Sequence, residues 1–234
     1  MAIIMKTEEL NQTLLEIWKK AELGSPTSRL PLFRSSLKPD CLLFVGINPS
    51  FSENGLKRLH KGEDIDIHEF YKYPPAKDEI DIEQHLALEK SASNSYAYYG
   101  KFENLADCLK LDWNHLDLLS VRETNQALIR KTLFDNLRNP LPFAESQLRV
   151  SEAILRQSQP VAIVVANAFA SGLFKKRFEL TFDHEAGCYR LALGNRSVPV
   201  FLTSMLTGQR ALDTFSYERL IWHIRFVLEN GSVG

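Results

Sequence analysis

Four apolar runs along the chain are typical of strands that are buried in a sheet. They lie near Leu42, Leu116, Val161 and Val200, and three of them end directly in a polar loop. Helical patterns fill the intervals between the first three runs and follow the last one. This alternation predicts an α/β fold, a three-layer α/β/α sandwich with a central, mainly parallel four-stranded sheet.

Amphipathic patterns predict helices at both ends of the chain and between the strands. In the first helix, apolar residues from Leu10 to Ala21 recur on one face, and Gly24 ends the pattern. A hairpin is expected where two short apolar runs flank Gly194 and Asn195. Further helices are expected over residues 78–92, 103–109, 125–137, 148–157 and 217–228, with another that Asn167 caps.

The first strand ends in the sequence Gly-Ile-Asn-Pro-Ser, residues 46–50. Gly46 lets a ligand approach the backbone closely, and Asn48 carries both a donor and an acceptor. Pro49 cannot continue the ladder of hydrogen bonds, so it ends the strand. These residues predict a binding site at the carboxyl end of the strand, where open α/β sheets bind ligands.

This five-residue motif resembles the first motif of the uracil-DNA glycosylase superfamily, and it is closest to the GINPG form of the mismatch-specific uracil/thymine branch. A second apolar strand that ends in a polar, glycine-containing loop, residues 198–209, lies where that family keeps its second motif. The likeness covers residues 40–228 in the order of elements, while residue identity is confined to the first motif. It implies one domain over residues 1–234, with an N-terminal helix and crossing segment (1–39) and an acidic insertion (53–95).

The resemblance implies a hydrolase that excises uracil or another deaminated base from DNA. Such an enzyme flips the base out of the stack and cleaves its N-glycosidic bond without a metal or cofactor. Asn48 would hold the attacking water and Phe51 would stack on the base, while backbone around Gly46 and Ile47 would line the pocket. Ser50 replaces the last glycine of GINPG, and it either narrows the pocket or contributes a hydroxyl.

Two further polar loops supply candidates for base and DNA recognition. Ser120, Arg122 or Asn125 would read the base edge by resemblance, or these residues merely cap the helix that follows. In the second-motif loop, Ser204 would line the pocket and Leu206 would fill the gap left by the flipped base, or Leu206 simply packs under the last helix. The remaining candidates for DNA contacts are Gln209, Arg210 and the basic cluster Lys175, Lys176 and Arg177, which is otherwise a solubilising surface.

Two features depart from the family and support an alternative function. Active members commonly carry His-Pro-Ser or Asn-Pro-Ser in the second motif, whereas this chain has Thr203-Ser204-Met205. In addition, residues 61–90 hold nine acidic residues against four basic ones, a pattern typical of a solvated face that would repel a phosphate backbone. The alternative is a catalytically altered or inactive superfamily member that binds a base, a nucleotide or a partner protein.

Composition limits the remaining possibilities. The chain of 234 residues is 44% hydrophobic with a net charge of −1, so only a local basic patch would bind DNA. The three cysteines form no C-x-x-C, the six histidines show no metal-ligand spacing, and no G-x-S-x-G or G-x-G-x-x-G motif occurs. Without a membrane-length apolar run or a signal-peptide pattern, we expect a cytoplasmic monomer that contacts no membrane.

Overall fold

A computed structural model of the chain describes residues 6–21, 24, 27–60, 65–75 and 80–230. The chain divides into two compact units, each made of three stretches that are separate in sequence. Unit 1 comprises residues Met1–Ser36, Asn48–Tyr96 and Asp117–Ala153, and unit 2 comprises Leu37–Ile47, Ala97–Leu116 and Ile154–Gly234.

Unit 2 is built on a six-stranded sheet with the order β2-β1-β3-β6-β5-β4. Strand β3 is parallel to both β1 and β6. Phe44 of β1 lies opposite Val164 of β3, and Val164 lies opposite Phe201 of β6. Strand β5 is antiparallel to β6, and β4 is antiparallel to β5. The strands are β1 (Leu42–Gly46), β2 (Trp113–Asp117, of which Asp117 is assigned to unit 1), β3 (Ala162–Ala166), β4 (Thr181–Asp183), β5 (Cys188–Leu193) and β6 (Arg196–Thr203).

The α/β class is confirmed, and the four predicted strands lie next to one another as β2, β1, β3 and β6. The prediction of a four-stranded, mainly parallel sheet is not confirmed, because the sheet is mixed and has six strands. The predicted hairpin forms β5 and β6 around Gly194, so its first arm extends the sheet. Strand β4 was missed because it has only three residues and its apolar Phe182 is exposed, which leaves no apolar run to recognise.

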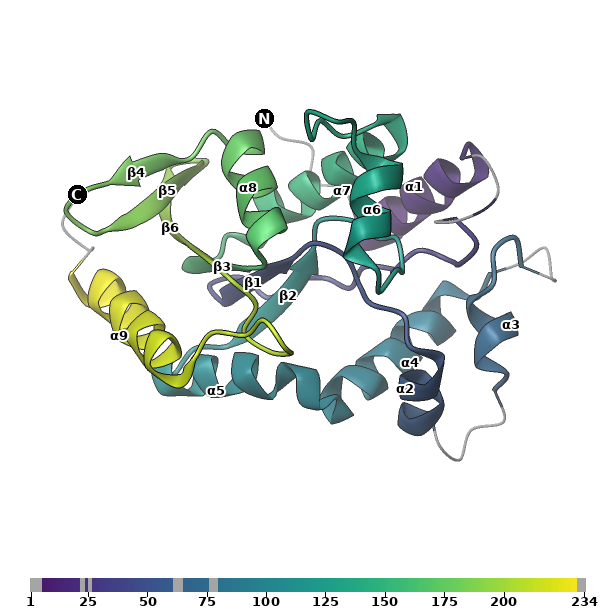
Figure 1. Ribbon diagram of the computed structural model, residues 1–234, viewed down its shortest axis with the longest axis horizontal. Helices are drawn as coiled ribbons and strands as arrows, with labels where there is room; N and C mark the ends of the chain where they lie inside the picture. Colours follow the sequence, from purple (N-terminus) through teal and green to yellow (C-terminus); the bar gives the residue numbers. More distant parts are fainter. Residues whose placement is uncertain (1–5, 22–23, 25–26, 61–64, 76–79, 231–234) are drawn as a thin grey trace. The chain divides into compact units, whose positions relative to one another are not determined.

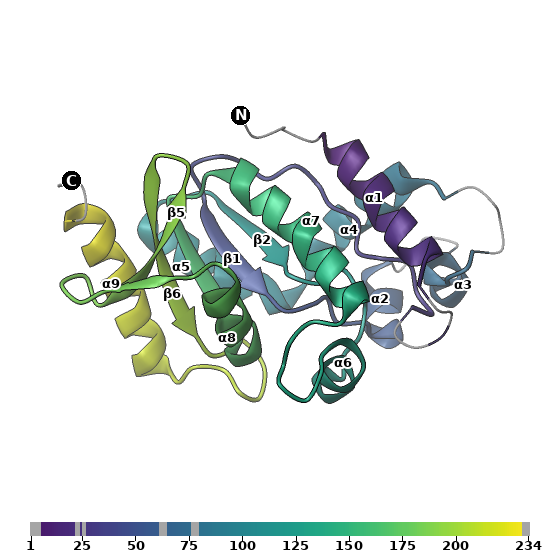
Figure 2. The same cartoon turned by 90° about the horizontal axis from the view of Figure 1, so that it is seen from above.

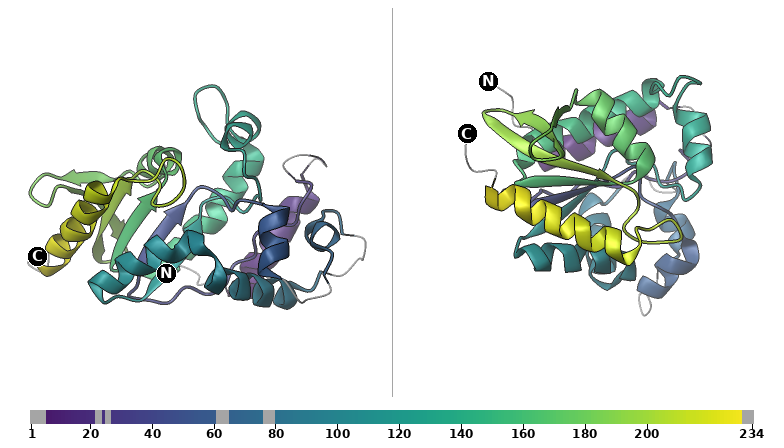
Figure 3. Two further views of the ribbon diagram at one scale, coloured as in Figure 1. Left: turned by 60° about the horizontal axis from the view of Figure 1, so that its bottom comes forward. Right: turned by 60° about the vertical axis from the view of Figure 1, so that its left-hand side comes forward.

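Helices cover both faces of this sheet, as Figure 1 and the right-hand view of Figure 3 show. Helices α5 (Gly100–Leu109) and α9 (Thr214–Asn230) pack on one face, where alternate residues of the central strands, among them Phe44 and Val164, form a buried cluster. Helix α8 (Ala168–Arg177) covers the other face, and Ser171 Oγ donates to the carbonyl oxygen of Val165 at 3.2 Å. Strands β1 and β3 are therefore buried on both faces, as their continuous apolar sequences predict.

Unit 1 is helical and contains the acidic segment, residues 53–95. Trp18 is fully buried, its ring meets the ring of Phe143 edge to face at 5.0 Å, and its indole N–H donates to the carbonyl of Arg29 at 2.8 Å. This contact joins helix α1, which carries Trp18, to helix α7, which carries Phe143, and Figure 2 shows the two helices side by side. The helices are α1 (Thr7–Lys19), α2 (Glu53–Leu59), α3 (Ile67–Tyr71), α4 (Ile82–Ser95), α6 (Gln126–Leu133) and α7 (Pro142–Ser158), the last of which continues into unit 2.

All the predicted helices form, although their bounds shift by several residues. The largest shift is in α7, which begins at Pro142 and not at Leu148, because Pro is well suited to the first turn of a helix. The acidic segment folds into α2, α3 and α4, while its residues 61–64 and 76–79 lie outside the described residues.

Asn167 caps α8 as its sequence position predicts. Its Oδ1 accepts hydrogen bonds from the backbone N–H groups of Phe169 at 2.9 Å and Ala170 at 3.0 Å. Because these N–H groups have no partner inside the helix, we expect Asn167→Ala to lower the free energy of unfolding by about 1 kcal/mol. Urea denaturation measures this change, and the exposed turn residue Asn195, replaced in the same way, serves as the control. Equal stability of the two variants would contradict this role.

Candidate active site

The side chain of Asn48 is held by the loop that follows β2. Its Nδ2 donates to the carbonyl oxygens of Glu123 at 2.6 Å, Pro49 at 3.0 Å and Val121 at 3.3 Å. Carbonyl oxygens only accept hydrogen bonds, so this arrangement fixes which end of the carboxamide faces the loop. Nδ2 faces the loop, and Oδ1 is left as an acceptor with no hydrogen bond to the described part of the chain.

Phe51 lies on the loop after β1 that also carries Asn48, and its backbone is hydrogen-bonded to Thr124 in the loop after β2. The Thr124 hydroxyl accepts from the N–H of Phe51 at 3.1 Å and donates to the Phe51 carbonyl at 2.7 Å. The half-buried Phe51 ring meets the ring of Tyr71 edge to face at 5.7 Å, and the guanidinium carbon of Arg29 lies 4.1 Å from its centroid. Arg29 and Tyr71 therefore fix the ring, and neither residue was predicted from the sequence.

Arg122 fixes the position of the loop that receives Asn48. The residue is 5% exposed, and its guanidinium forms an ion pair with Glu89 from the acidic segment. Its Nε donates to the carbonyl of Leu30 at 3.2 Å, and its Cζ lies 4.7 Å from the centroid of the Tyr71 ring. The carbonyl of Arg122 in turn accepts from Arg29 Nη1 at 3.3 Å. Both neighbours of Arg122 in the chain, Val121 and Glu123, are acceptors for Asn48.

A second buried arginine shares this environment. Arg34 Nη2 donates to the carbonyl of Asp117 at 2.7 Å and to the hydroxyl of Ser120 at 3.0 Å. Burial lowers the pKa of Arg34 to about 10, and the charge of Arg122 acts in the same direction, while Asp117 and Glu89 oppose the shift. Burial also raises the pKa of Glu89, although the two arginines favour its ionised form. Two carboxylates, the buried Asp117 and the 16% exposed Glu89, thus offset the charges of the two buried arginines.

His85 lies among aromatic rings beside this cluster. It is 5% exposed, and its ring centroid lies 4.0 Å from that of Phe70 and 5.5 Å from that of Phe33. Burial lowers the pKa of His85 to about 4, and the charge of Arg122 contributes to the shift. The imidazole is therefore neutral near pH 7 and acts as part of the apolar core of unit 1.

The two other loop residues predicted to read the base have structural partners. Ser120 is fully buried, its hydroxyl accepts from Arg34, and its backbone N–H donates to Gln147 Oε1 at 2.8 Å. Asn125 is exposed and caps α6, because its Oδ1 accepts from the N–H groups of Ala127 at 3.0 Å and Leu128 at 3.2 Å. The capping alternative is thus confirmed for Asn125.

The second-motif loop belongs to unit 2 and contains a buried leucine. Leu206 is 1% exposed and is part of the core cluster that includes Tyr217 and Ile224 of α9, so its packing under the last helix is confirmed. To fill a gap in DNA it would first have to leave this core. Gln209 and Arg210 are exposed at the turn around Gly208, while Ser204 is half-buried in the same loop.

The basic cluster forms the last turn of α8, also in unit 2. Lys175 and Lys176 are exposed, and Arg177 is half-buried. Lys175 Nζ donates to the hydroxyl of Tyr189 at 2.8 Å. Cations at the C-terminal end of a helix interact favourably with its dipole, which gives this cluster a structural role independent of DNA.

The first-motif residues are divided between the two units. Gly46 ends β1 and Ile47 is buried, both in unit 2, whereas Ser50 is exposed in unit 1 with Asn48 and Phe51. Within unit 1, the structure thus brings Asn48 and Phe51 together on one loop with Arg29, Tyr71 and Arg122. Arg29 and Tyr71 come from segments in which the sequence shows no motif, whereas Arg122 lies in a polar loop that the sequence analysis singled out.

No protein-family model matches the chain, and no curated protein is significantly similar to it. In the part of the chain that the structure describes, no group of three or more His, Cys, Asp and Glu residues could hold a metal ion. No helix within the described ranges has both the length and the apolar character needed to cross a membrane.

Removing Glu89 from its ion pair with Arg122 should destabilise the protein far more than removing one partner of an exposed ion pair. We expect Glu89→Ala to lower the free energy of unfolding by about 3–5 kcal/mol, because it leaves Arg122 buried without its carboxylate. Arg149 and Glu145 form an exposed pair four residues apart on α7, and Glu145→Ala should cost about 0.5 kcal/mol or less. Similar losses in the two variants, measured by urea denaturation, would contradict the importance of the buried pair.

The low pKa of His85 predicts a loss of stability in acid. The unfolded chain takes up a proton near pH 6.5 while the folded state resists it down to about pH 4, so stability is complete above pH 6.5 and falls below it. From pH 7 to pH 5 the expected contribution of His85 is a loss of about 1–2 kcal/mol. Glu89 acts in the opposite direction, because its raised pKa makes the folded state take up that proton more readily.

Comparison of the wild type with His85→Phe isolates this contribution. Phenylalanine suits the aromatic surroundings and cannot be protonated, so the variant should lose less stability than the wild type between pH 7 and pH 5. The same substitution at exposed His68 is the control. An identical pH dependence in the wild type and His85→Phe would show that His85 does not cause the acid sensitivity.

Proposed function

We propose that the protein is a uracil-DNA glycosylase-like hydrolase that excises uracil or another deaminated base from DNA. The observation that carries this proposal is the orientation of the Asn48 carboxamide. Its N–H groups are used by three carbonyl oxygens, so Oδ1 is the end that can accept a hydrogen bond from a water molecule. This is the role that the resemblance of the Gly-Ile-Asn-Pro-Ser motif assigns to Asn48.

The chemistry requires a water positioned near the sugar and a means of stabilising charge on the departing base. Asn48 orients the water but cannot remove its proton as a carboxylate would, so the reaction is slow. Phe51 stacks on the flipped base. Arg29, whose guanidinium carbon lies 4.1 Å from the centroid of that ring, provides a positive charge near the leaving base. This cation would partly replace the histidine that the second motif lacks.

DNA is the proposed partner, and the proposed form is a cytoplasmic monomer. The exposed side chains of Gln209, Arg210, Lys175 and Lys176 support contacts with phosphates or with the opposite strand. One carboxylate of the acidic segment, Glu89, is neutralised inside unit 1 by Arg122, which reduces the repulsion that the acidic composition implies.

A second candidate function is the binding of a base, a nucleotide or a partner protein without turnover. It is favoured because Ser120 and Leu206, two of the residues assigned by resemblance, are buried in packing contacts. Binding without turnover would distinguish the two functions: saturable binding of a free base or nucleotide that does not weaken with added salt, together with no base release from DNA, would favour this function over DNA repair.

Base release from uracil-containing DNA tests the proposal directly. The enzyme in excess is incubated with a single strand that contains uracil and with a G·U duplex, and abasic sites are then cleaved with alkali. We expect strand cleavage by the wild type and a rate about 100-fold lower for Asn48→Ala, because the attacking water loses its acceptor.

The control is Asn195→Ala, which removes an exposed carboxamide far from the motif in sequence. Thermal denaturation of Asn48→Ala shows whether its loop remains folded, since the carbonyls of Glu123, Pro49 and Val121 each lose one hydrogen bond. No cleavage of any uracil substrate by the wild type would remove the catalytic claim. Full activity in Asn48→Ala would mean that the water is held elsewhere.

A further inference from the structure

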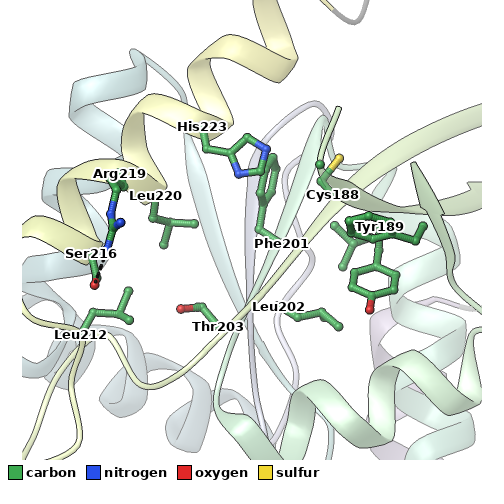
Figure 4. Close-up of a pocket in the computed structure, with 13 residues that line it drawn as sticks. Cys188, Tyr189, Phe201, Leu202, Thr203, Leu212, Ser216, Arg219, Leu220 and His223 are labelled. Carbon is green, nitrogen blue, oxygen red and sulfur yellow. Dashed lines mark hydrogen bonds between the residues drawn. The ribbon is translucent and has the colours of Figure 1, made fainter. Parts of the chain in front are cut away.

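Unit 2 contains a pocket between α9 and the strands β5 and β6 (Figure 4). Its volume is about 270 Å³, slightly below the range of about 300–1,000 Å³ typical of sites for drug-sized ligands. It therefore suits a molecule of about one ring. All the residues that line it belong to unit 2, so the pocket shares no residue with the loop of Asn48.

The walls of the pocket are mainly apolar. Phe201 is buried beneath it, and its ring meets the imidazole of His223 edge to face, with centroids 5.1 Å apart and an interplanar angle of 85°. Leu212 and Leu220 close the side towards α9, as Figure 4 shows. A flat ring placed here would contact aromatic and aliphatic carbon on several sides.

His223 presents an acceptor to this pocket. Its Nε2 lies 2.7 Å from the carbonyl oxygen of Ala186, and because that oxygen only accepts, Nε2 carries the hydrogen. In the neutral ring Nδ1 then has a free lone pair, and no described residue donates to it. Figure 4 shows this second ring nitrogen on the side of Leu220 and Phe201.

Thr203 and Arg219 supply hydrogen-bond donors to the pocket. The Thr203 hydroxyl makes no hydrogen bond within the described ranges, and in Figure 4 it points towards Leu212. Arg219 is exposed, and one of its nitrogens donates to the hydroxyl of Ser216 at 3.3 Å. None of the described carboxylates forms an ion pair with Arg219. The nearby carboxylate of Asp213 instead accepts a hydrogen bond from the Ser216 hydroxyl at 2.6 Å.

We propose that this pocket binds a small planar heterocycle that carries both N–H and C=O groups, as the pyrimidine bases do. The ring stacks against Phe201 and the leucines, an N–H donates to His223 Nδ1, and carbonyl oxygens accept from Arg219 and Thr203. The ligand is the free base or the base of a nucleoside, which present the same ring. The proposal does not depend on glycosylase activity, because it uses no residue of the Asn48 loop.

Titration with uracil, 2′-deoxyuridine and phenol, followed by saturation-transfer NMR, tests this site. We expect saturable binding of uracil in the millimolar range, as befits a ligand of few atoms, and weaker binding of phenol, which has a ring but no N–H and C=O edge. Binding of 2′-deoxyuridine as tight as that of uracil would assign the site to nucleosides, and much weaker binding would assign it to the free base. The Asn48→Ala variant should bind uracil as the wild type does.

Two variants test the assigned contacts. Thr203→Val keeps the shape of the side chain and Arg219→Gln removes the cation, and each should weaken uracil binding about fivefold. The matched controls, Thr181→Val on β4 and Arg225→Gln on α9, lie outside the pocket and should leave the affinity unchanged. The proposal is overturned if uracil shows no saturable binding, if phenol binds equally well, or if neither pocket variant weakens binding.

Discussion

The burial of the Arg122 guanidinium is the constraint on which the candidate site depends. A buried cation is tolerated only with a carboxylate and further acceptors around it, and Arg122 obtains these from Glu89 and the carbonyl of Leu30. Its position in turn fixes the backbone of Val121 and Glu123, whose carbonyls receive the Asn48 carboxamide. The orientation of Asn48 is therefore coupled to the packing of the acidic segment, residues 53–95, which carries Glu89.

This coupling gives the acidic segment a structural role. Its composition is typical of a solvated face, yet Glu89 is directed inward to Arg122, and Tyr71 packs on both Arg122 and Phe51. The same residues explain why His85 is neutral, because it is enclosed by rings next to a buried cation. The acidic segment thus supports both the Phe51 ring and the Asn48 carboxamide of the proposed site.

The sequence was informative where a residue acts within its own segment. The apolar runs predicted the four strands, and Asn167 was recognised as a helix cap, because these patterns depend on neighbouring residues. Contacts between distant segments left no pattern, as with Glu89 and Arg122 or Arg29 and Phe51. The pocket beside α9 was missed for the same reason, since β5, β6 and α9 contribute to it. The motif identified Asn48, but only the structure gives the direction of its carboxamide.

Hydrogen exchange of the Asn48 side-chain amide tests this coupling most directly. In nitrogen-15 spectra, Asn48 is assigned by the signal that disappears in Asn48→Ala. Our account predicts that its two N–H protons exchange more slowly than those of the exposed Asn195, and that Arg122→Met removes this protection while the sheet amides of Val164 and Phe201 stay protected. Fast exchange of Asn48 in the wild type, or unchanged protection in Arg122→Met, would contradict the account.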